Sequence, residues 1–382
     1  MATLNTTNIK HASSSSNNIV LNADGSTTIP NLSVRPNRNL IINGAMQVAE
    51  RGDVSSVTSG YGGADRFKFD RSGAAVVTLK QDTGDITQGF AKAQRIDVTT
   101  ADSSLAAGDY AMLSYRFEGQ DLQQLKKGTA NAQQVTLSFH IKSPKTGTHI
   151  VELVDQSNSG RHVNKAYTVS SANTWEKKTV TFPMETSNAI TNDNARRMDL
   201  NWWLAAGSTY TSGTLQTSWG ADTNANRAVG QVNTMDNTSN DIYITGVQLE
   251  VGSVATNFEH RSFGQELALC QRYFYMHTDA QTNSGAEAIG TGTWYNGYNL
   301  FVSVHFPTTM RTVPSLYQVS GTDYFQFNAS NAASAFDGFN EIWRSNKNMA
   351  YLGEYNESNT TGASAMVQTN NTNARLGFNA EL

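Results

Sequence analysis

VTLSFHIK, residues 135–142, decides the fold class because apolar and polar residues alternate strictly along it. The apolar positions from Val135 to Ile141 fall on one side of an extended chain, and Thr136, Ser138, His140 and Lys142 fall on the other. Successive side chains of a β-strand point to opposite faces of the sheet, so a period of two predicts a half-buried strand.

The same alternation recurs between residues 39 and 258. MDLNWWL (198–204), LSYRF (113–117) and KTVTF (178–182) each place large apolar side chains at every second position. Turn signals separate these runs, and one short helical patch, DLQQLKKG (121–128), interrupts them. Many strands and few helices predict an all-β fold, with an antiparallel β-sandwich of the jelly-roll type over residues 39–262.

The pattern changes at both ends of this region. Ser262 and Gln265 have capping-box spacing ahead of ELALCQRYF, which predicts a short helix at a domain junction. Alternation resumes at Leu300, so residues 263–382 are predicted to form this linker helix and a smaller C-terminal β-rich domain. Residues 1–38 have too few large apolar residues to fold alone and are predicted to form an extended arm. Asp24-Gly25 is a turn sequence typical of a β-hairpin.

Composition bounds the function. The 382 residues carry 28 basic and 32 acidic side chains, a net charge of −4, so no basic face for nucleic acid or an anionic membrane is expected. The single Cys270 excludes an intrachain disulfide and a cysteine-based zinc site. No apolar run is long enough to span a bilayer and no secretory signal is expected.

Glu259, His260, Arg261 and Ser262 form the one stretch that looks catalytic. Adjacent residues of an extended chain point to opposite sides, so these four side chains cannot converge on one point. We therefore interpret them as the structural joint between two domains, with Ser262 as a helix N-cap.

Other signatures of enzymes are equally weak. The seven histidines show no HExxH spacing, and the sequence has neither a G-x-S-x-G elbow nor a Walker loop. We expect no catalytic residue, no metal site and no cofactor. A polysaccharide-degrading spike stays open as an alternative, because any two of the many carboxylates could form a glycosidase pair.

Several longer strings resemble sequences of a known protein family. RNLIINGAMQVAERG, GGADRFKF, ANTWEKKTVTF and GVQLEVGSVATNFEHRSFGQELALCQRYF, which lie between residues 38 and 274, resemble tail-fibre and other virion proteins of tailed bacteriophages. The central module of such proteins is similar to carbohydrate-binding jelly-rolls. The resemblance implies a jelly-roll, homotrimerisation and a place on the surface of a virion that is assembled in the host cytoplasm.

Carbohydrate-binding relatives of this kind often carry an acidic residue on the last strand that helps to bind a structural Ca²⁺. The matching run here, YITGVQLE, has Thr245-Gly246 at that place, which argues against the ion. Asp65 and backbone carbonyls would be the remaining oxygen ligands.

Sugar recognition needs flat aromatic faces and planar amides, and the C-terminal domain offers both. The candidate glycan-binding residues are Trp294, Tyr295, Tyr298, Trp343, Tyr351 and Tyr355, with Trp203 and Trp219 as secondary candidates in the jelly-roll. The competing interpretation is that half or more of these aromatics pack a small β-core, or that a trimer interface buries them.

The sequence therefore predicts a phage tail fibre, or its tip, that binds bacterial surface polysaccharide or lipopolysaccharide through residues 263–382. Residues 1–38 would attach to other tail or capsid proteins, and weak contacts would add up through a homotrimer. The main alternative is a structural virion protein, such as a head fibre, decoration or tail-assembly component, without receptor binding. Neither nucleic-acid binding nor membrane insertion is expected.

Overall fold

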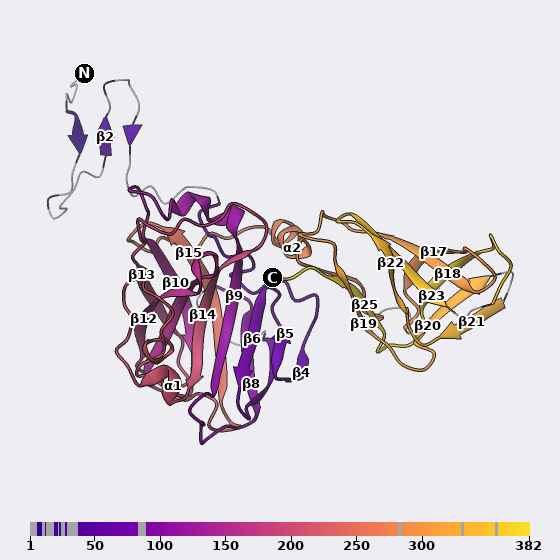
Figure 1. The fold of residues 1–382 in the computed structure, drawn as a ribbon, viewed down its shortest axis with the longest axis horizontal. Helices are drawn as coiled ribbons and strands as arrows, with labels where there is room; N and C mark the ends of the chain where they lie inside the picture. Colours follow the sequence, from indigo (N-terminus) through magenta and orange to yellow (C-terminus); the bar gives the residue numbers. More distant parts are fainter. Residues whose placement is uncertain are drawn as a thin grey trace.

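The computed structural model describes residues 6–9, 12, 19–21, 23, 27–28, 37–82, 89–281, 285–329, 332–355 and 358–382. Antiparallel β-sheets dominate the regular structure of the described residues, as predicted. Two six-stranded sheets form a sandwich, and two further sheets form a smaller unit that projects from its side (Figure 1). Among the described residues, no helix has the length and hydropathy needed to cross a bilayer.

The sandwich pairs two sheets that are assembled from strands far apart in the sequence. In spatial order, the first contains β13 (Glu176–Phe182), β10 (Val135–Lys142), β15 (Asp241–Val251), β8 (Ala93–Thr100), β7 (Val76–Asp82) and β4 (Val54–Val57). The second contains β12 (Arg161–Val169), β11 (Gly147–Asp155), β14 (Arg196–Ala206), β9 (Tyr110–Glu118), β6 (Phe67–Ser72) and β5 (Ser59–Tyr61). Short helical pieces connect them: η1 (Gly119–Leu125), η2 (Gln156–Asn158), α1 (Ser208–Thr211) and η3 (Asn224–Asn226).

The core of the sandwich follows the alternation read from the sequence. Leu137 and Phe139 on β10 are fully buried, and so are Leu200 and Trp202 on β14. The ring of Phe139 meets the ring of Trp202 edge to face at 5.7 Å between centroids, which joins the two sheets at the centre of the core. The predicted helical patch exists as the 3₁₀ helix η1, whose Leu122 and Leu125 pack into the same core.

The outer face of the first sheet differs from the sequence prediction. Ser138 and His140, expected on a solvated face, are only 4% and 9% exposed. Phe90 lies against His140 with 5.3 Å between ring centroids, and Phe258 packs edge to face on Phe90. Alternation fixes the face on which a side chain lies, but it cannot show that a later chain segment covers that face.

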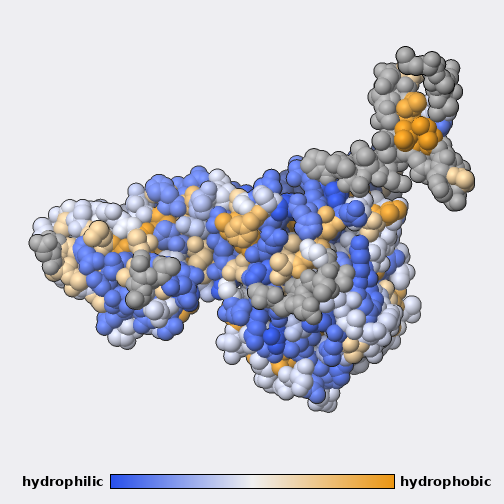
Figure 2. Space-filling view, turned by 180° about the vertical axis from the view of Figure 1, so that it is seen from behind, coloured by the Kyte–Doolittle hydropathy of each residue, from blue (hydrophilic) through white to orange (hydrophobic). Residues whose placement is uncertain are grey.

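The N-terminal arm forms a small three-stranded sheet, β1 (Asn8–Ile9), β2 (Ile19–Leu21) and β3 (Thr27–Thr28), apart from the sandwich (Figure 1). β2 pairs with both neighbours, while the predicted turn at Asp24-Gly25 lies outside the described residues. Ile9 and Leu21 are 43% and 41% exposed, and Figure 2 shows an apolar group on the arm. Strands this short have no core of their own.

The stretch Glu259–Ser262, which looks catalytic in the sequence, has structural contacts between the sandwich and the helix that follows it. Glu259 accepts hydrogen bonds from the backbone N–H groups of Asn37 and Asn39, at 2.6 and 2.8 Å. Arg261 donates to the carbonyl of Ile41 at 3.0 Å and to Glu266 at 2.8 Å. These partners come from the residues that enter the sandwich and from the following helix, so both side chains have structural roles.

Ser262 begins the helix α2 (Phe263–Gln271) with the predicted capping box. Its hydroxyl accepts from the Gln265 N–H at 3.4 Å, and the Gln265 side chain accepts from the Ser262 N–H at 3.1 Å. His260 stacks on Phe90 with 5.6 Å between ring centroids. Each of the four residues Glu259–Ser262 therefore has a local partner, and Ser262 is the helix N-cap that the sequence predicted.

The distal unit, which we define as residues 274–379, contains the other two sheets. One is β16 (Phe274–Thr278), β25 (Arg375–Asn379) and β19 (Ser315–Val319). The other is β21 (Ala332–Phe336), β20 (Phe325–Ala329), β24 (Ser364–Thr369), β17 (Ala288–Trp294), β18 (Asn299–His305), β23 (Met349–Tyr355) and β22 (Glu341–Ser345). This unit has its own hydrophobic core, separate from that of the sandwich. The predicted domain boundaries at residues 38 and 262 stay predictions.

Charged side chains fasten the distal unit to the sandwich. Arg272 binds Glu118 of β9 with two hydrogen bonds of 2.8 Å, and the Tyr273 hydroxyl donates to the same carboxylate. Glu381 accepts from the buried Arg66 and, at 3.4 Å, from Arg51. The last residues of the chain thus return to the sandwich.

The same region holds a carboxyl group that is protonated more readily than usual. Burial, and then the neighbouring carboxylate of Asp65, raise the pKa of Glu50 to about 8. Asp65, which the sequence offered as a Ca²⁺ ligand, lies 3.4 Å from Arg51 and accepts from the Glu50 N–H at 3.0 Å. Its observed partners are therefore protein donors.

Candidate functional site

The outer face of the seven-stranded sheet carries the candidate site. On β18, Leu300, Val302 and Val304 point into the core and are buried. Phe301 and Ser303 lie between them in sequence and therefore point to the opposite, solvent-facing side. The outward position of Phe301 could have been read from the sequence, because it interrupts the same alternation that identified the strand.

A β-bulge on β22 adds two more outward side chains. Ile342 pairs with Leu352 of β23, but the next paired residue is Arg344, opposite Tyr351. The extra residue, Trp343, has no partner in the register, and Trp343 and Arg344 are both exposed. A bulge re-aims side chains in this way and places two neighbours in sequence on one face.

Four aromatic rings meet on this face, and we call them the aromatic cluster. The cluster consists of Tyr295, Phe301, Trp343 and Tyr355. Trp343 stacks on Phe301 with 4.3 Å between ring centroids and lies 5.7 Å from Tyr295. Phe301 also contacts Tyr295 at 6.0 Å and Tyr355 at 6.2 Å. Tyr295 is 65% and Trp343 36% exposed, so large ring surfaces are open to solvent.

The rings are supported by the strand beneath them. Gly353 pairs with Phe301, and a Cβ at this position would lie 3.1 Å from the Phe301 ring and 3.0 Å from the Tyr355 ring. The absence of a side chain therefore lets both rings lie close to the strand. The Tyr355 hydroxyl donates to Glu341, while partial desolvation and then this carboxylate raise the pKa of Tyr355 to about 12.

Polar groups surround the rings. The guanidinium of Arg344 lies 4.4 Å from the centroid of the Trp343 ring. Asn296, in the β17–β18 loop, accepts hydrogen bonds from the N–H groups of Tyr298 and Asn299, which orders the loop that carries Tyr295. The site thus combines apolar ring faces with amides and one guanidinium.

The structure brings together three of the predicted glycan-binding residues, Tyr295, Trp343 and Tyr355, in ring contact through Phe301. Tyr351 lies on the same face, opposite Arg344, and is 39% exposed. Tyr298 is 65% exposed on the adjacent loop. Phe301 and Arg344 were not predicted from the sequence.

Trp294 requires a correction. It is 1% exposed and packs edge to face on Phe327 with 5.0 Å between ring centroids, inside the core of the distal unit. It pairs with Leu300, which also faces the core. The loop composition around residues 294–299 suggested a surface residue, but Trp294 is the last residue of β17 and points inward.

The secondary candidates in the sandwich also have structural surroundings. Trp203 lies on the outer face of β14, as alternation predicted, but is fully buried against Tyr110, Tyr210 and Arg227. Trp219 is half-buried, and its indole N–H donates to the Pro183 carbonyl at 2.8 Å. Trp203 therefore has no ring face open to a glycan in this structure, because the chain segment after β14 covers it.

A second surface, the polar groove, lies over β9, β14 and β6 of the sandwich and has a volume of about 320 Å³. Its lining residues are Asp70, Tyr110, Met112, Ser114, Arg116, Val154, Gln156, Arg196, Asp199, Asn201 and Arg227. Asp199 accepts from Arg196 at 2.7 Å and from Gln156 at 2.6 Å. Tyr110 is the one aromatic ring among these lining residues, so the groove offers hydrogen bonds but little stacking surface.

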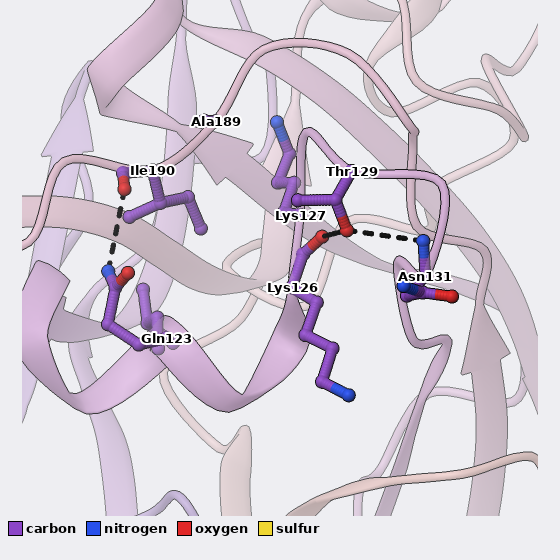
Figure 3. Close-up of a pocket in the computed structure, with 8 residues that line it drawn as sticks. Gln123, Lys126, Lys127, Thr129, Asn131, Ala189 and Ile190 are labelled. Atoms are coloured by element: carbon purple, nitrogen blue, oxygen red, sulfur yellow. Dashed lines mark hydrogen bonds between the residues drawn. The ribbon is translucent and has the colours of Figure 1, made fainter.

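A second hollow, of about 420 Å³, lies where η1 ends (Figure 3). Its polar groups bond to one another: Gln123 donates to the Ile190 carbonyl at 3.4 Å and Thr129 donates to the Lys126 carbonyl at 2.8 Å. Nowhere in the described part of the chain do three His, Cys, Asp or Glu side chains form a group that could hold a metal ion. The aromatic cluster is therefore the strongest candidate site.

Comparisons with known proteins do not assign the chain to a family. No protein-family model matches it, and no curated protein matches it. It is similar to the enzymatically active domain of bacteriophage CBA120 tailspike protein 4, at 14% identity and a TM-score of 0.32, over 57% of this chain and 22% of that one.

Two carbohydrate-binding modules are also similar. The family 11 module of a Clostridium thermocellum cellulosomal cellulase is 12% identical, with a TM-score of 0.28, over 54% of this chain and 98% of the module. TmCBM61, solved in complex with β-1,4-galactotriose, is 10% identical, with a TM-score of 0.29, over 56% of this chain and 99% of the module. Likeness at this level assigns no function.

Proposed function

We propose that the protein binds carbohydrate on a bacterial surface through the aromatic cluster. The observation that carries the proposal is the meeting of Tyr295, Phe301 and Trp343 on the solvent side of a sheet, with Tyr295 65% exposed. Sugar rings have apolar C–H faces that stack on aromatic rings, and hydroxyl groups that bond to amides. Because Phe301 and Trp343 stand on strands and Tyr295 lies on a loop ordered by Asn296, the rings are held in place before a ligand arrives.

Removing the tryptophan ring tests the proposal. We expect Trp343→Ala to weaken binding by about tenfold or more, since aromatic anchors carry most of the binding energy at recognition sites. The measurement is glycan-array screening followed by titration calorimetry on the best ligand. The matched control is Met366→Ala, which removes a side chain that is 67% exposed on the same sheet, outside the cluster. Equal affinity of the folded Trp343→Ala protein and the wild type would exclude the cluster as the site.

We further propose that the chain is a trimeric tail fibre, or the tip of one, on a phage virion. The sequence resemblance supports this role, and so does the arm, whose exposed Ile9 and Leu21 need a partner surface. Trimerisation would multiply weak sugar contacts at the distal units. A monomer in light scattering at micromolar concentration would exclude the trimer. Failure of excess protein to block phage adsorption would favour a structural virion protein instead.

A further inference from the structure

Resting on the proposed function, we infer that the aromatic cluster selects acidic glycans, with Arg344 binding the carboxylate of a uronic acid or a similar sugar. The cluster contains an exposed cation that would favour an acidic sugar over a neutral one. Arg344 is exposed, and no carboxylate oxygen of the described residues lies within 4.0 Å of its nitrogens. The nearby acid of β22, Glu341, is already bonded to the Tyr355 hydroxyl.

The position of the guanidinium fits a planar ligand group. Arg344 lies over the Trp343 ring, 4.4 Å from its centroid. A guanidinium stacked on a ring is held by its face, while its N–H groups point outward in its own plane. That edge matches the two oxygens of a carboxylate, and such paired hydrogen bonds are stronger than bonds between neutral groups.

The surrounding charge also favours an anion. Lys347 follows Arg344 in the β22–β23 turn and is exposed. Two cations thus stand on the β22–β23 hairpin, residues 341–355, in which Glu341 is the one exposed acid, whereas Glu354 is buried on the other side of β23. An acidic sugar would stack on the exposed rings and place its carboxylate against Arg344. A neutral sugar would leave this cation without a partner.

The bulge on β22 brings the stacking ring and the carboxylate-binding cation to the same face of the sheet. Without the extra residue, Trp343 and Arg344 would point to opposite faces of the sheet, as neighbours on a regular strand do. With it, the ring and the cation share one face, in register with Tyr351.

The test compares each acidic polymer with its own neutral form. The probes are polygalacturonate, alginate and hyaluronate, each also prepared with its carboxyl groups reduced to alcohols, so that the backbone is nearly unchanged. We expect the wild type to bind at least one acidic polymer about tenfold more tightly than its reduced form. Arg344→Gln should abolish this preference, whereas Lys347→Gln should reduce it by less than threefold. Arg344→Lys should restore only part of it, because an ammonium lacks the planar fork.

The outcomes separate the two proposals. If the wild type binds acidic and reduced polymers equally, or if Arg344→Gln keeps the preference, the selection of acidic glycans is wrong and sugar binding by the cluster stands. If Arg344→Gln and Lys347→Gln lose the preference equally, long-range attraction replaces the specific pair and the inference is also wrong. If the wild type binds no acidic polymer but binds neutral glycans on the array, selection of acidic glycans is again overturned. If it binds neither kind, both proposals fail.

Discussion

Replacing Lys127 by methionine should lower the free energy of unfolding of the sandwich by about 3–5 kcal/mol, the usual cost of removing one member of a buried ion pair. The Lys127 ammonium is 1% exposed and donates to Asp155 at 2.5 Å, Glu185 at 2.8 Å and the Asn188 carbonyl at 2.7 Å. Asp155 is fully buried. Without the lysine, its carboxylate keeps hydrogen bonds from Ser157 and Asn158 but loses its only ion-pair contact within 4.0 Å among the described residues.

The loss of stability in Lys127→Met should arise at one of the two carboxylates that Lys127 contacts. Burial alone would raise the pKa of Glu185, but hydrogen bonds from Arg161 and Lys127 hold it below its ordinary value, so this carboxylate stays charged. Arg161 would still pair with Glu185 in the variant, whereas no cation would replace Lys127 at Asp155. The cost therefore arises mainly at Asp155, the last residue of β11.

The chain offers a matched control for this experiment. Lys126 precedes Lys127, is exposed, and carries the same side chain into solvent (Figure 3). Lys126→Met should change the free energy of unfolding by less than about 0.5 kcal/mol, as surface substitutions usually do. Urea unfolding followed by tryptophan fluorescence measures both variants. A loss below about 1 kcal/mol in Lys127→Met would show that the pair adds little beyond its desolvation cost.

The fold class was predictable because the sandwich is built by alternation. Phe139 on β10 and Trp202 on β14 were assigned to the core from period two, and both are fully buried. The burial of Ser138 and Trp203 was not predictable in the same way. Their faces are covered by segments distant in sequence, and no local pattern records which loop will cross a sheet.

The candidate site was predictable in part. Tyr295, Trp343 and Tyr355 were found because aromatic and amide residues gather in the same loops and strands. Trp294 was misassigned, since composition does not show where strand β17 ends. Arg344 was missed for a different reason: its side of the sheet depends on a bulge, and a bulge has no signature in the residues of EIWRS.

Replacing Glu381 by alanine should weaken the attachment of the distal unit to the sandwich by about 3–5 kcal/mol. Glu381 is the carboxylate that pairs with Arg66, whose side chain is 1% exposed and lies 3.3 Å from the centroid of the Tyr273 ring. Arg66 belongs to the sandwich, whereas Glu381 follows β25 of the distal unit. Removing the carboxylate leaves a buried guanidinium with one remaining acceptor among the described residues, the Arg116 carbonyl at 2.9 Å.

The attachment and the fold of the distal unit can be measured separately. The core of the distal unit is its own, so the variant should keep the strands of that unit while the joint opens more often. Hydrogen exchange should therefore speed up at Tyr273 and in the returning residues 380–382, where the Ala380 N–H bonds to the Tyr273 carbonyl at 2.7 Å. Asp323→Asn removes one carboxylate from an exposed turn of the same unit and should leave this exchange unchanged. Equal exchange in Glu381→Ala and Asp323→Asn would mean that the remaining contacts, such as the Arg272–Glu118 ion pair and the hydrogen bonds between Arg311 and Asn194, hold the joint without the Glu381 carboxylate.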